Sequence, residues 1–578
     1  MNSLRTAKRF VFPLLGLWVL LYASFSLLKP PLLDGADSVQ AEAAREMAVN
    51  GHWLTPHVNG VISLSVSPLL TWVTALSFKL FGVADWTARL PFAICALALF
   101  VVTLSLGARL FLTPVAGFYA AIILLTSAGI FLFAHLLYPE IFTTLWTTLA
   151  IYFFWRSLHH GHASLGTAIG FSAVCALGVL SQGLVGIIVP AIVVLLFLAI
   201  TRNLPHLLRW HPLIGVPVFL VIAAPWHIAV RYANAIPPHF AVGPGPQSAP
   251  LLLVWAFLLL WMLPWCFFSV AALVRLPARE SPHSKHMDRS HQARLLLVLW
   301  IGVEALSVAF MPRQEFSILP ALPAVALLAA GWMAADESAL SRVGLAFAWV
   351  FLAAGAVGGA VAVFLALRAP SPSPGVDIAS LLRLHPGQHH IFLGHLGDVT
   401  FASMGAFRIP LLIAAAALFA GVITNLIFRL REHARMANCF LAGMMVFLLI
   451  AAQVALNTFS PVISSEVLAE AIKPELGTSN IVVVDGQYRH ASALGFYLER
   501  HIEVMSANSE EDQLLPVGVA ANFEDLPALE TQWNGPGRVF LWTTPQSAPK
   551  LPGTTYLIAR DGGREILSNQ PNSGGASF

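Results

Sequence analysis

Charge is scarce in this sequence. Only 11% of its 578 residues are Asp, Glu, Lys or Arg, whereas 57% are hydrophobic. A soluble globular protein of this length carries a larger polar fraction, so the composition excludes that class. The net charge is +3, and the chain contains no basic tract that would indicate nucleic-acid binding.

Cysteine is also sparse, which excludes a disulfide framework. The chain has four cysteines, and their spacing matches neither a paired framework nor a metal site. All four fall in apolar runs, so we expect buried thiols that pack as small hydrophobic side chains. They are Cys95, Cys175, Cys266 and Cys439.

Long apolar runs, in contrast, are abundant. About thirteen of them reach or approach the roughly 20 residues that cross a bilayer as a helix. They are continuous, whereas the strands of a transmembrane β-barrel are short and alternate. We therefore predict an α-helical polytopic membrane protein. The predicted spans lie at about 10–28, 87–112, 114–134, 141–156, 164–181, 184–201, 212–230, 251–274, 294–311, 317–335, 343–367, 409–428 and 438–458.

The basic residues indicate how these spans are oriented. When the spans are counted alternately from a cytoplasmic N-terminus, most arginines fall in the inside loops, among them Arg109, Arg156 and Arg435. This is the positive-inside bias. An odd number of spans then places the C-terminal part on the outer (periplasmic) side of the membrane.

A change of composition near residue 461 predicts two domains. Residues 1–460 form the transmembrane domain, with a periplasmic loop at 30–86. Residues 461–578 are more polar and alternate strand-like runs with a helix-like stretch, which predicts a small periplasmic α/β domain. Its expected strands lie at 481–485, 538–544 and 554–561, and its expected helix at 489–500.

The predicted topology gathers polar residues at the periplasmic surface. The first long polar interruption, 33–70, supplies several acids and histidines, and turns between later spans supply further acids and bases. The residues concerned are Asp34, Asp37, Glu42, His52, His57, Glu140, Gln182, Arg231, Arg313 and Glu315.

The first loop itself contains two helical patterns. Residues 38–49 have the pattern of a short amphipathic helix that lies on the membrane surface. Asp37 precedes it, with Gln40 three residues further on, so Asp37 is either a helix cap or a functional acid. Pro68 begins a second helical stretch at 69–81.

A carboxylate beside cations at the outer membrane surface suits a reaction on a lipid-linked anion. In glycosyl transfer from a polyprenyl phosphate, the acid takes the acceptor proton or holds a divalent ion, and the cations hold the phosphate. An ion pathway needs polar groups inside the spans instead. Only Glu304 and Gln453 fit that description, and Glu304 is either functional or a hydrogen-bonded structural acid.

Several short stretches carry a family resemblance. They include AEAAREM at 41–47, GHWLTPHVNG at 51–60, SPLLTW at 67–72, APWHIAV at 224–230 and ILPALPAVALLAAGW at 318–332. In order and spacing they resemble the GT-C superfamily of membrane glycosyltransferases, specifically the aminoarabinose (lipid A) transferase and protein O-mannosyltransferase-like group. The resemblance implies transfer of a sugar from a polyprenyl-phosphate donor to an envelope acceptor, which is lipid A, a glycan or a protein.

The resemblance also implies which acids act. The Asp-Glu pair that opens the family's loop falls on Ala36 and Asp37, and the family's Asp at the head of the fourth span falls on Glu140. Asp37 and Glu140 are therefore the expected catalytic residues, and the ligands of a divalent metal ion if one is used.

This sequence has fewer cationic residues than the family pattern at the positions that would bind phosphate. A family lysine falls on Gln182, another on Arg313, and an arginine falls on His57. Arg313, Arg231 and a protonated His57 are expected to compensate, and Gln182 keeps a polar group in the place of its lysine.

The missing cations leave other functions open. A family member without transferase activity would act as a binding or scaffold subunit in envelope glycolipid assembly. A transporter or flippase would use Glu304, but the sequence shows no internal inverted repeats in support of one.

Overall fold

The computed structural model describes most of the chain. The described residues are 11–24, 31–63, 66–159, 164–234, 251–274, 288–308, 317–338, 341–373, 375–383, 398–505 and 526–572. Arg313 and Glu315 lie outside them.

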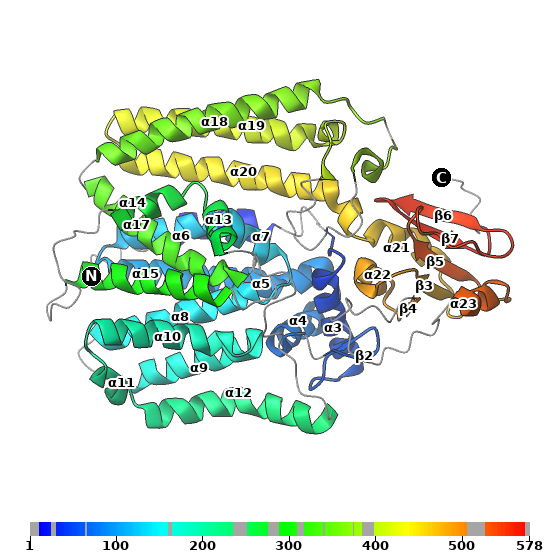
Figure 1. The fold of residues 1–578 in the computed structure, drawn as a ribbon, viewed down its shortest axis with the longest axis horizontal. Helices are drawn as coiled ribbons and strands as arrows, with labels where there is room; N and C mark the ends of the chain where they lie inside the picture. The colour runs from blue at the N-terminus through cyan, green and yellow to red at the C-terminus, as the bar shows by residue number, and fades with distance from the viewer. Residues whose placement is uncertain are drawn as a thin grey trace.

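A bundle of nearly parallel helices makes up the larger part of the molecule (Figure 1). Every predicted span overlaps a helix or a bent pair of helices. In chain order these are Val11–Ala23 with its π-helical end η1 (Val19–Ala23), α5 (Asp85–Leu110), α6 (Pro114–Leu125) with α7 (Ala128–His135), α8 (Glu140–His159), α9 (Leu165–Gln182), α10 (Val185–Ile200), α12 (Pro212–Asn234), α13 (Leu251–Trp261) with α14 (Cys266–Val274), α15 (Arg289–Val308), α17 (Leu322–Ser338), α18 (Arg342–Arg368), α19 (Arg408–Leu430) and α20 (Ala434–Ile463).

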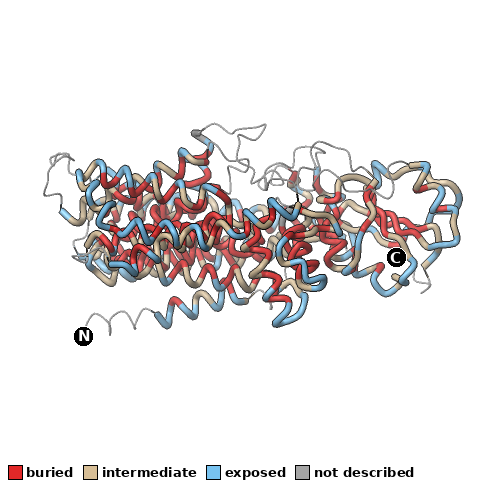
Figure 2. The backbone as a smooth tube through the Cα atoms, turned by 90° about the horizontal axis from the view of Figure 1, so that it is seen from below, coloured by how far each residue is buried: buried red, intermediate tan, exposed pale blue. Residues whose placement is uncertain are grey.

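The chain is a polytopic membrane protein. Eight of the described helices are long and apolar enough to cross a membrane, or up to ten if each bent pair is one span. The N-terminal helix and α10 are apolar but shorter than a full span. The N-terminal helix lies at the edge of the bundle, where much of its surface is exposed (Figure 2). As expected, three of the four thiols are buried; Cys439 is only partly so, and all four are unpaired.

A five-stranded sheet lies at one end of the bundle (Figure 1). Its order is β4-β3-β5-β7-β6, in which β3 pairs parallel with β4 and β5, and β7 pairs antiparallel with β5 and β6. The bounds are β3 (Ile481–Val484), β4 (Glu503–Val504), β5 (Val539–Thr543), β6 (Tyr556–Asp561) and β7 (Arg564–Ser568).

Three helices accompany the sheet. They are α21 (Glu466–Ile472), α22 (Ser492–Leu498) and α23 (Leu526–Trp533). The three predicted strands are confirmed, and the helix expected at 489–500 is present but shorter. The strands β4 and β7 were not predicted. β4 has only two residues, and the charged residues Arg564 and Glu565 at the start of β7 interrupt the apolar pattern.

The first loop forms the layer between the bundle and the sheet. It contains α3 (Ala36–Asn50), a two-stranded hairpin of β1 (His57–Val58) and β2 (Val61–Ile62), and α4 (Pro68–Phe81). The predicted second helix at 69–81 is thus confirmed. Figure 1 shows α3 between the membrane helices and α22.

The prediction that residues 38–49 lie on the membrane surface is wrong. One side of α3 packs Ala44 and Met47 into the core of the helical bundle. Its other side packs Val39 and Ala43 against the core of the C-terminal sheet. The helix is buried on both sides because the C-terminal part covers the face that the pattern assigned to water.

Candidate active site

Asp37 lies in the first turn of α3 and is held by three N–H donors. The Leu137 amide donates to its Oδ1 at 2.7 Å, and the Leu33 amide donates to its Oδ2 at 3.1 Å. The Arg89 guanidinium also donates to Oδ2, at 3.3 Å. The side chain of Asp37 caps nothing, because Gly35 occupies the N-cap position without a side-chain cap. The helix-cap interpretation of Asp37 is therefore wrong.

Burial and the three donors act on Asp37 in opposite directions. Only 2% of the residue is exposed, and this burial raises the pKa of Asp37. Arg89 and the two amides lower that pKa, but the net direction is upward. Each oxygen is thus already engaged by donors that favour its charged form.

Arg89 is a site residue that the sequence analysis missed. It is 2% exposed, and besides Asp37 it donates to the carbonyl oxygens of His135 and Pro31, each at 2.8 Å. It thereby ties α5, α7 and the start of the first loop to one carboxylate. The available signal was an arginine inside an apolar run, which is costly unless the residue is paired.

Glu140 and Gln182 meet as the topology predicts. Glu140 opens α8, three residues after the amide that holds Asp37, and is 4% exposed. Gln182, the last residue of α9, places its Nε2 3.5 Å from Glu140 Oε1. The family's lysine at this place would form an ion pair, whereas Gln182 supplies only a neutral donor.

Two other predicted phosphate contacts lie at the first loop. His57 is half-buried in β1, with its Nδ1 2.9 Å from the Thr55 carbonyl oxygen. Burial lowers the pKa of His57, so it lacks the positive charge at neutral pH that its predicted role requires. Arg231 is exposed near the end of α12, and neighbouring Asn234 donates to the Thr55 hydroxyl at 3.2 Å.

The donors around Asp37 do not suit a divalent ion. A metal at Oδ2 would face the Arg89 guanidinium and an amide N–H that point at the same oxygen. In the described part of the chain, no group of three or more His, Cys, Asp or Glu side chains is placed to hold a metal. The side chains at Asp37 therefore do not fit a divalent ion.

Asp34 joins this site to the C-terminal sheet. Its Oδ2 accepts from Arg564 at the start of β7 at 2.5 Å, and from the Ser465 hydroxyl at 2.8 Å. Its Oδ1 accepts from the Ala493 amide in α22 at 2.8 Å. Burial raises the pKa of Asp34, and Arg564 opposes that rise. The loop that carries Asp37 is therefore anchored by residues more than 400 positions away.

The buried carboxyl of Glu46, in α3, is expected to make the stability of the protein depend on pH. Burial, with nearby Glu42, raises the pKa of Glu46 from 4.5 to about 7. Between these pH values the folded chain keeps a proton that the unfolded chain releases, so stability falls by up to about 1.4 kcal/mol per pH unit of rise. Glu46→Gln keeps an oxygen for the Gly60 amide and removes the titration. We expect thermal unfolding in detergent at pH 5, 6, 7 and 8 to show a shallower decline in the variant. Equal declines in both proteins would contradict this assignment.

The helical spans, the clamped first loop and the sheet that covers it together share the fold of a solved membrane protein, ArnT. The chain is similar to ArnT from Cupriavidus metallidurans in the apo state, with a TM-score of 0.78 and 21% identity over 99% of both chains. It is similar to the same protein bound to undecaprenyl phosphate, with a TM-score of 0.76 and 20% identity over 97% of this chain and 98% of that one. These likenesses establish the fold.

Sequence comparisons also find membrane transferases to which parts of this chain are similar. Residues 65–228 match the family described as dolichyl-phosphate-mannose-protein mannosyltransferase. The undecaprenyl phosphate-alpha-4-amino-4-deoxy-L-arabinose arabinosyl transferase of Aeromonas salmonicida is 29% identical over 276 residues, which cover 45% of this chain and 49% of the relative. The enzyme of that name from Shewanella sediminis is 26% identical over 330 residues, covering 52% and 55%. The chain thus spans about half the length of the curated relatives it matches.

Proposed function

We propose that this protein is a membrane glycosyltransferase that moves a sugar from a polyprenyl-phosphate donor to an envelope acceptor at the periplasmic face of the bacterial inner membrane. The acceptor is lipid A, another glycan or a protein. The observation that carries the proposal is the juxtaposition of Asp37, Arg89 and Glu140 under a first loop clamped in place, in a fold that aligns with ArnT from end to end.

The contacts divide the work between the two acids. Asp37 is engaged by donors on both oxygens, so we assign it to hold the start of the loop and to set the local charge. Glu140 then acts as the general base. The acceptor hydroxyl attacks the anomeric carbon, its proton passes to Glu140, and the bond from the sugar to the phosphate oxygen breaks. The polyprenyl phosphate leaves with the electron pair of that bond.

The proposal includes the placement of the chain in the membrane. The N-terminus is cytoplasmic, and residues 461–578 form the periplasmic domain that covers the first loop. Arg231 and Arg313 are the cations assigned to the donor phosphate, with Gln182 as a neutral donor. Supporting this, Asn234 and Thr55 hold the end of α12 against the first loop.

A gain of charge at residue 182 tests the phosphate side. Gln182→Lys places an ammonium group beside Glu140, where the resembling family has its lysine. A charge-assisted contact to phosphate is about twice as strong as a neutral one. We expect undecaprenyl phosphate to stabilise the purified variant at roughly tenfold lower lipid concentration than it stabilises the wild type. The measurement is thermal unfolding in detergent across a lipid titration, with Gln182→Met as the control and Arg313→Ala as the loss variant. No stabilisation of any of these proteins by the lipid would contradict the proposed donor.

A second candidate function is a non-catalytic subunit that binds envelope glycolipids. It is favoured by the neutral Gln182 and by the lowered pKa of His57, which together leave fewer cations for the phosphate. Glu140→Gln separates the two functions. A transferase loses turnover while it still binds undecaprenyl phosphate, whereas a scaffold keeps its function in the cell.

A further inference from the structure

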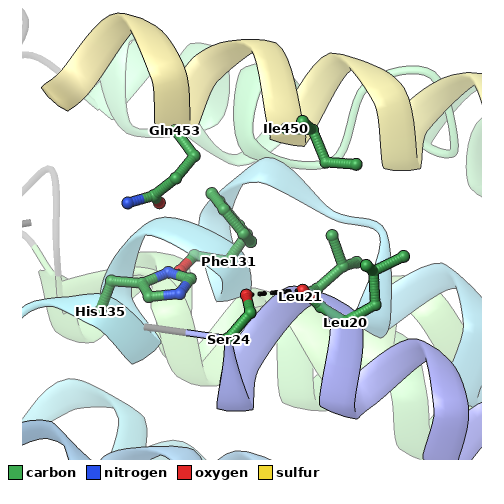
Figure 3. A pocket seen from close by; sticks show the side chains of 7 residues that line it. All are labelled: Leu20, Leu21, Ser24, Phe131, His135, Ile450 and Gln453. Atoms are coloured by element: carbon green, nitrogen blue, oxygen red, sulfur yellow. Dashed lines mark hydrogen bonds between the residues drawn. The ribbon is translucent and has the colours of Figure 1, made fainter. Parts of the chain in front are cut away.

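A small cavity lies between the N-terminal helix, α7 and α20. Its volume is about 20 Å³, which is room for one small polar group such as a carbonyl or a water molecule. Figure 3 shows the side chains that line it, three polar and four apolar. They are Ser24, His135, Gln453, Leu20, Leu21, Phe131 and Ile450.

Gln453 is the unusual member of this lining. It is 4% exposed, and neither its amide oxygen nor its amide nitrogen has a hydrogen-bond partner among the described residues. A buried polar group left unsatisfied is costly, and more so at membrane depth, where water is excluded. The amide points into the cavity toward His135 (Figure 3). The group that satisfies it therefore belongs in this cavity.

The other two polar side chains of the lining, Ser24 and His135, each form a hydrogen bond with the backbone of their own helix. The Ser24 hydroxyl donates to the Leu20 carbonyl at 2.7 Å, and His135 Nδ1 lies 2.5 Å from the Phe131 carbonyl oxygen. The helix on one wall ends in the π-helix η1, a geometry that is rare and recurs at functional sites. Gln453 remains the group with both donor and acceptor capacity to offer.

The cavity adjoins both the membrane and the proposed active site. Leu20, on its wall, is 50% exposed on the outer side of the N-terminal helix. On the inner side, the His135 carbonyl accepts from Arg89, which in turn donates to Asp37. The cavity is therefore linked to the acid site through the backbone of His135.

The chemistry of Gln453 discriminates between lipids. A polyprenyl chain has no polar atom beyond its phosphate, so it leaves the amide unpaired. Acylated lipids carry ester or amide carbonyls, and in some cases hydroxyls, just below their head groups. A glutamine amide donates to such a carbonyl and accepts from such a hydroxyl. Leu20, Leu21 and Ile450 offer an apolar surface to the adjoining methylenes.

We propose that this cavity binds the acyl linkage of an acylated lipid, with Gln453 as the hydrogen-bonding residue. The source is either an acylated glycolipid acceptor or a phospholipid of the surrounding bilayer, and both present the same group. The acceptor source rests on the proposed transferase function, whereas the cavity's preference for an acyl linkage does not.

An ester and an ether lipid of equal chain length test the proposal. The probes are phosphatidylglycerol with two ester-linked chains and its dialkyl ether analogue, titrated against the detergent-purified chain in thermal unfolding. We expect the ester lipid to stabilise the wild type at about fivefold lower concentration, the ratio given by one net hydrogen bond. Gln453→Leu is expected to abolish the difference. Thr458→Val, on the same helix with its bond inside the helix, is expected to keep it.

Further measurements distinguish a glycolipid acceptor from a bilayer phospholipid and keep the test valid if one variant misfolds. Ile450→Trp fills the cavity and is expected to abolish the preference as well, should Gln453→Leu fold poorly. An acylated glucosamine disaccharide that binds more tightly than phosphatidylglycerol, through Gln453, identifies the acceptor as the source. Equal binding of ester and ether lipids, as a cavity that holds only water would give, overturns the proposal, and so does a preference that survives both variants. Stabilisation by undecaprenyl phosphate is measured separately, so its loss counts against the transferase and not against the cavity.

Discussion

Replacing Asp37 by Asn is expected to destabilise the protein by about 3–5 kcal/mol and to abolish sugar transfer. The asparagine NH₂ faces donors that now point at a carboxylate oxygen, and Arg89 keeps its charge at a site where its side chain is 3% exposed. Breaking one side of a buried ion pair has costs of this size. The measurement is unfolding in detergent, with turnover followed in parallel once a donor is known.

A matched control comes from an exposed pair. Glu499 lies 3.5 Å from Lys473, and both side chains are more than half exposed. Glu499→Gln is expected to change stability by less than about 1 kcal/mol. An Asp37→Asn variant as stable as Glu499→Gln would show that the clamp on Asp37 contributes little. The double variant Asp37→Leu with Arg89→Met is expected to be more stable than either single change, because it removes both charges together.

Replacing Arg564 by Gln is expected to destabilise the protein by about 3 kcal/mol and to weaken binding of the lipid phosphate. Arg564 is the cation beside Asp34, whose side chain is 5% exposed, and it also stacks over Trp542. Without it, Asp34 is a buried carboxylate that no longer faces a cation at 2.5 Å. The loop that begins there carries Asp37 three residues later, so disorder at Asp34 spreads to the site.

Lys473 provides the control for this prediction. It pairs with Glu499 in the same C-terminal part of the chain, and both side chains are more than half exposed. Lys473→Gln is expected to cost less than about 1 kcal/mol and to leave stabilisation by undecaprenyl phosphate unchanged. If Arg564→Gln and Lys473→Gln behave alike, the C-terminal sheet does not hold the first loop through Asp34.

The two predictions together imply that substitutions in the first loop change stability as well as chemistry. A substitution at Asp37 has no purely chemical effect, because the same carboxylate joins α3, α5 and the turn before α8. Glu140→Gln is the better test of chemistry, since a glutamine at residue 140 still accepts a hydrogen bond from Gln182. Loss of turnover with unchanged unfolding is the expected outcome there.

Much of the helical architecture could be predicted from the sequence. A bilayer demands about 20 consecutive apolar residues for each span, so every span leaves a local pattern that needs no knowledge of its neighbours. The strands β3, β5 and β6 also leave local patterns, and the motifs of the first loop indicated the family likeness. Asp37, Glu140 and Gln182 were placed on one face by counting spans alone.

Tertiary structure decided which groups touch. No local pattern pairs Asp37 with Arg89 or Asp34 with Arg564, because each pair joins segments far apart in the chain. The periodicity of α3 indicated one buried face, whereas the C-terminal sheet buries the second. The charge state of His57 likewise depends on burial that its neighbours in sequence do not reveal. The sequence by itself therefore determined which segments cross the membrane and where the polar loop lies. Only the tertiary structure decided which charges of that loop form buried ion pairs. The cost of burying a charge is offset by a partner of opposite charge, and that partner comes from another segment of the chain.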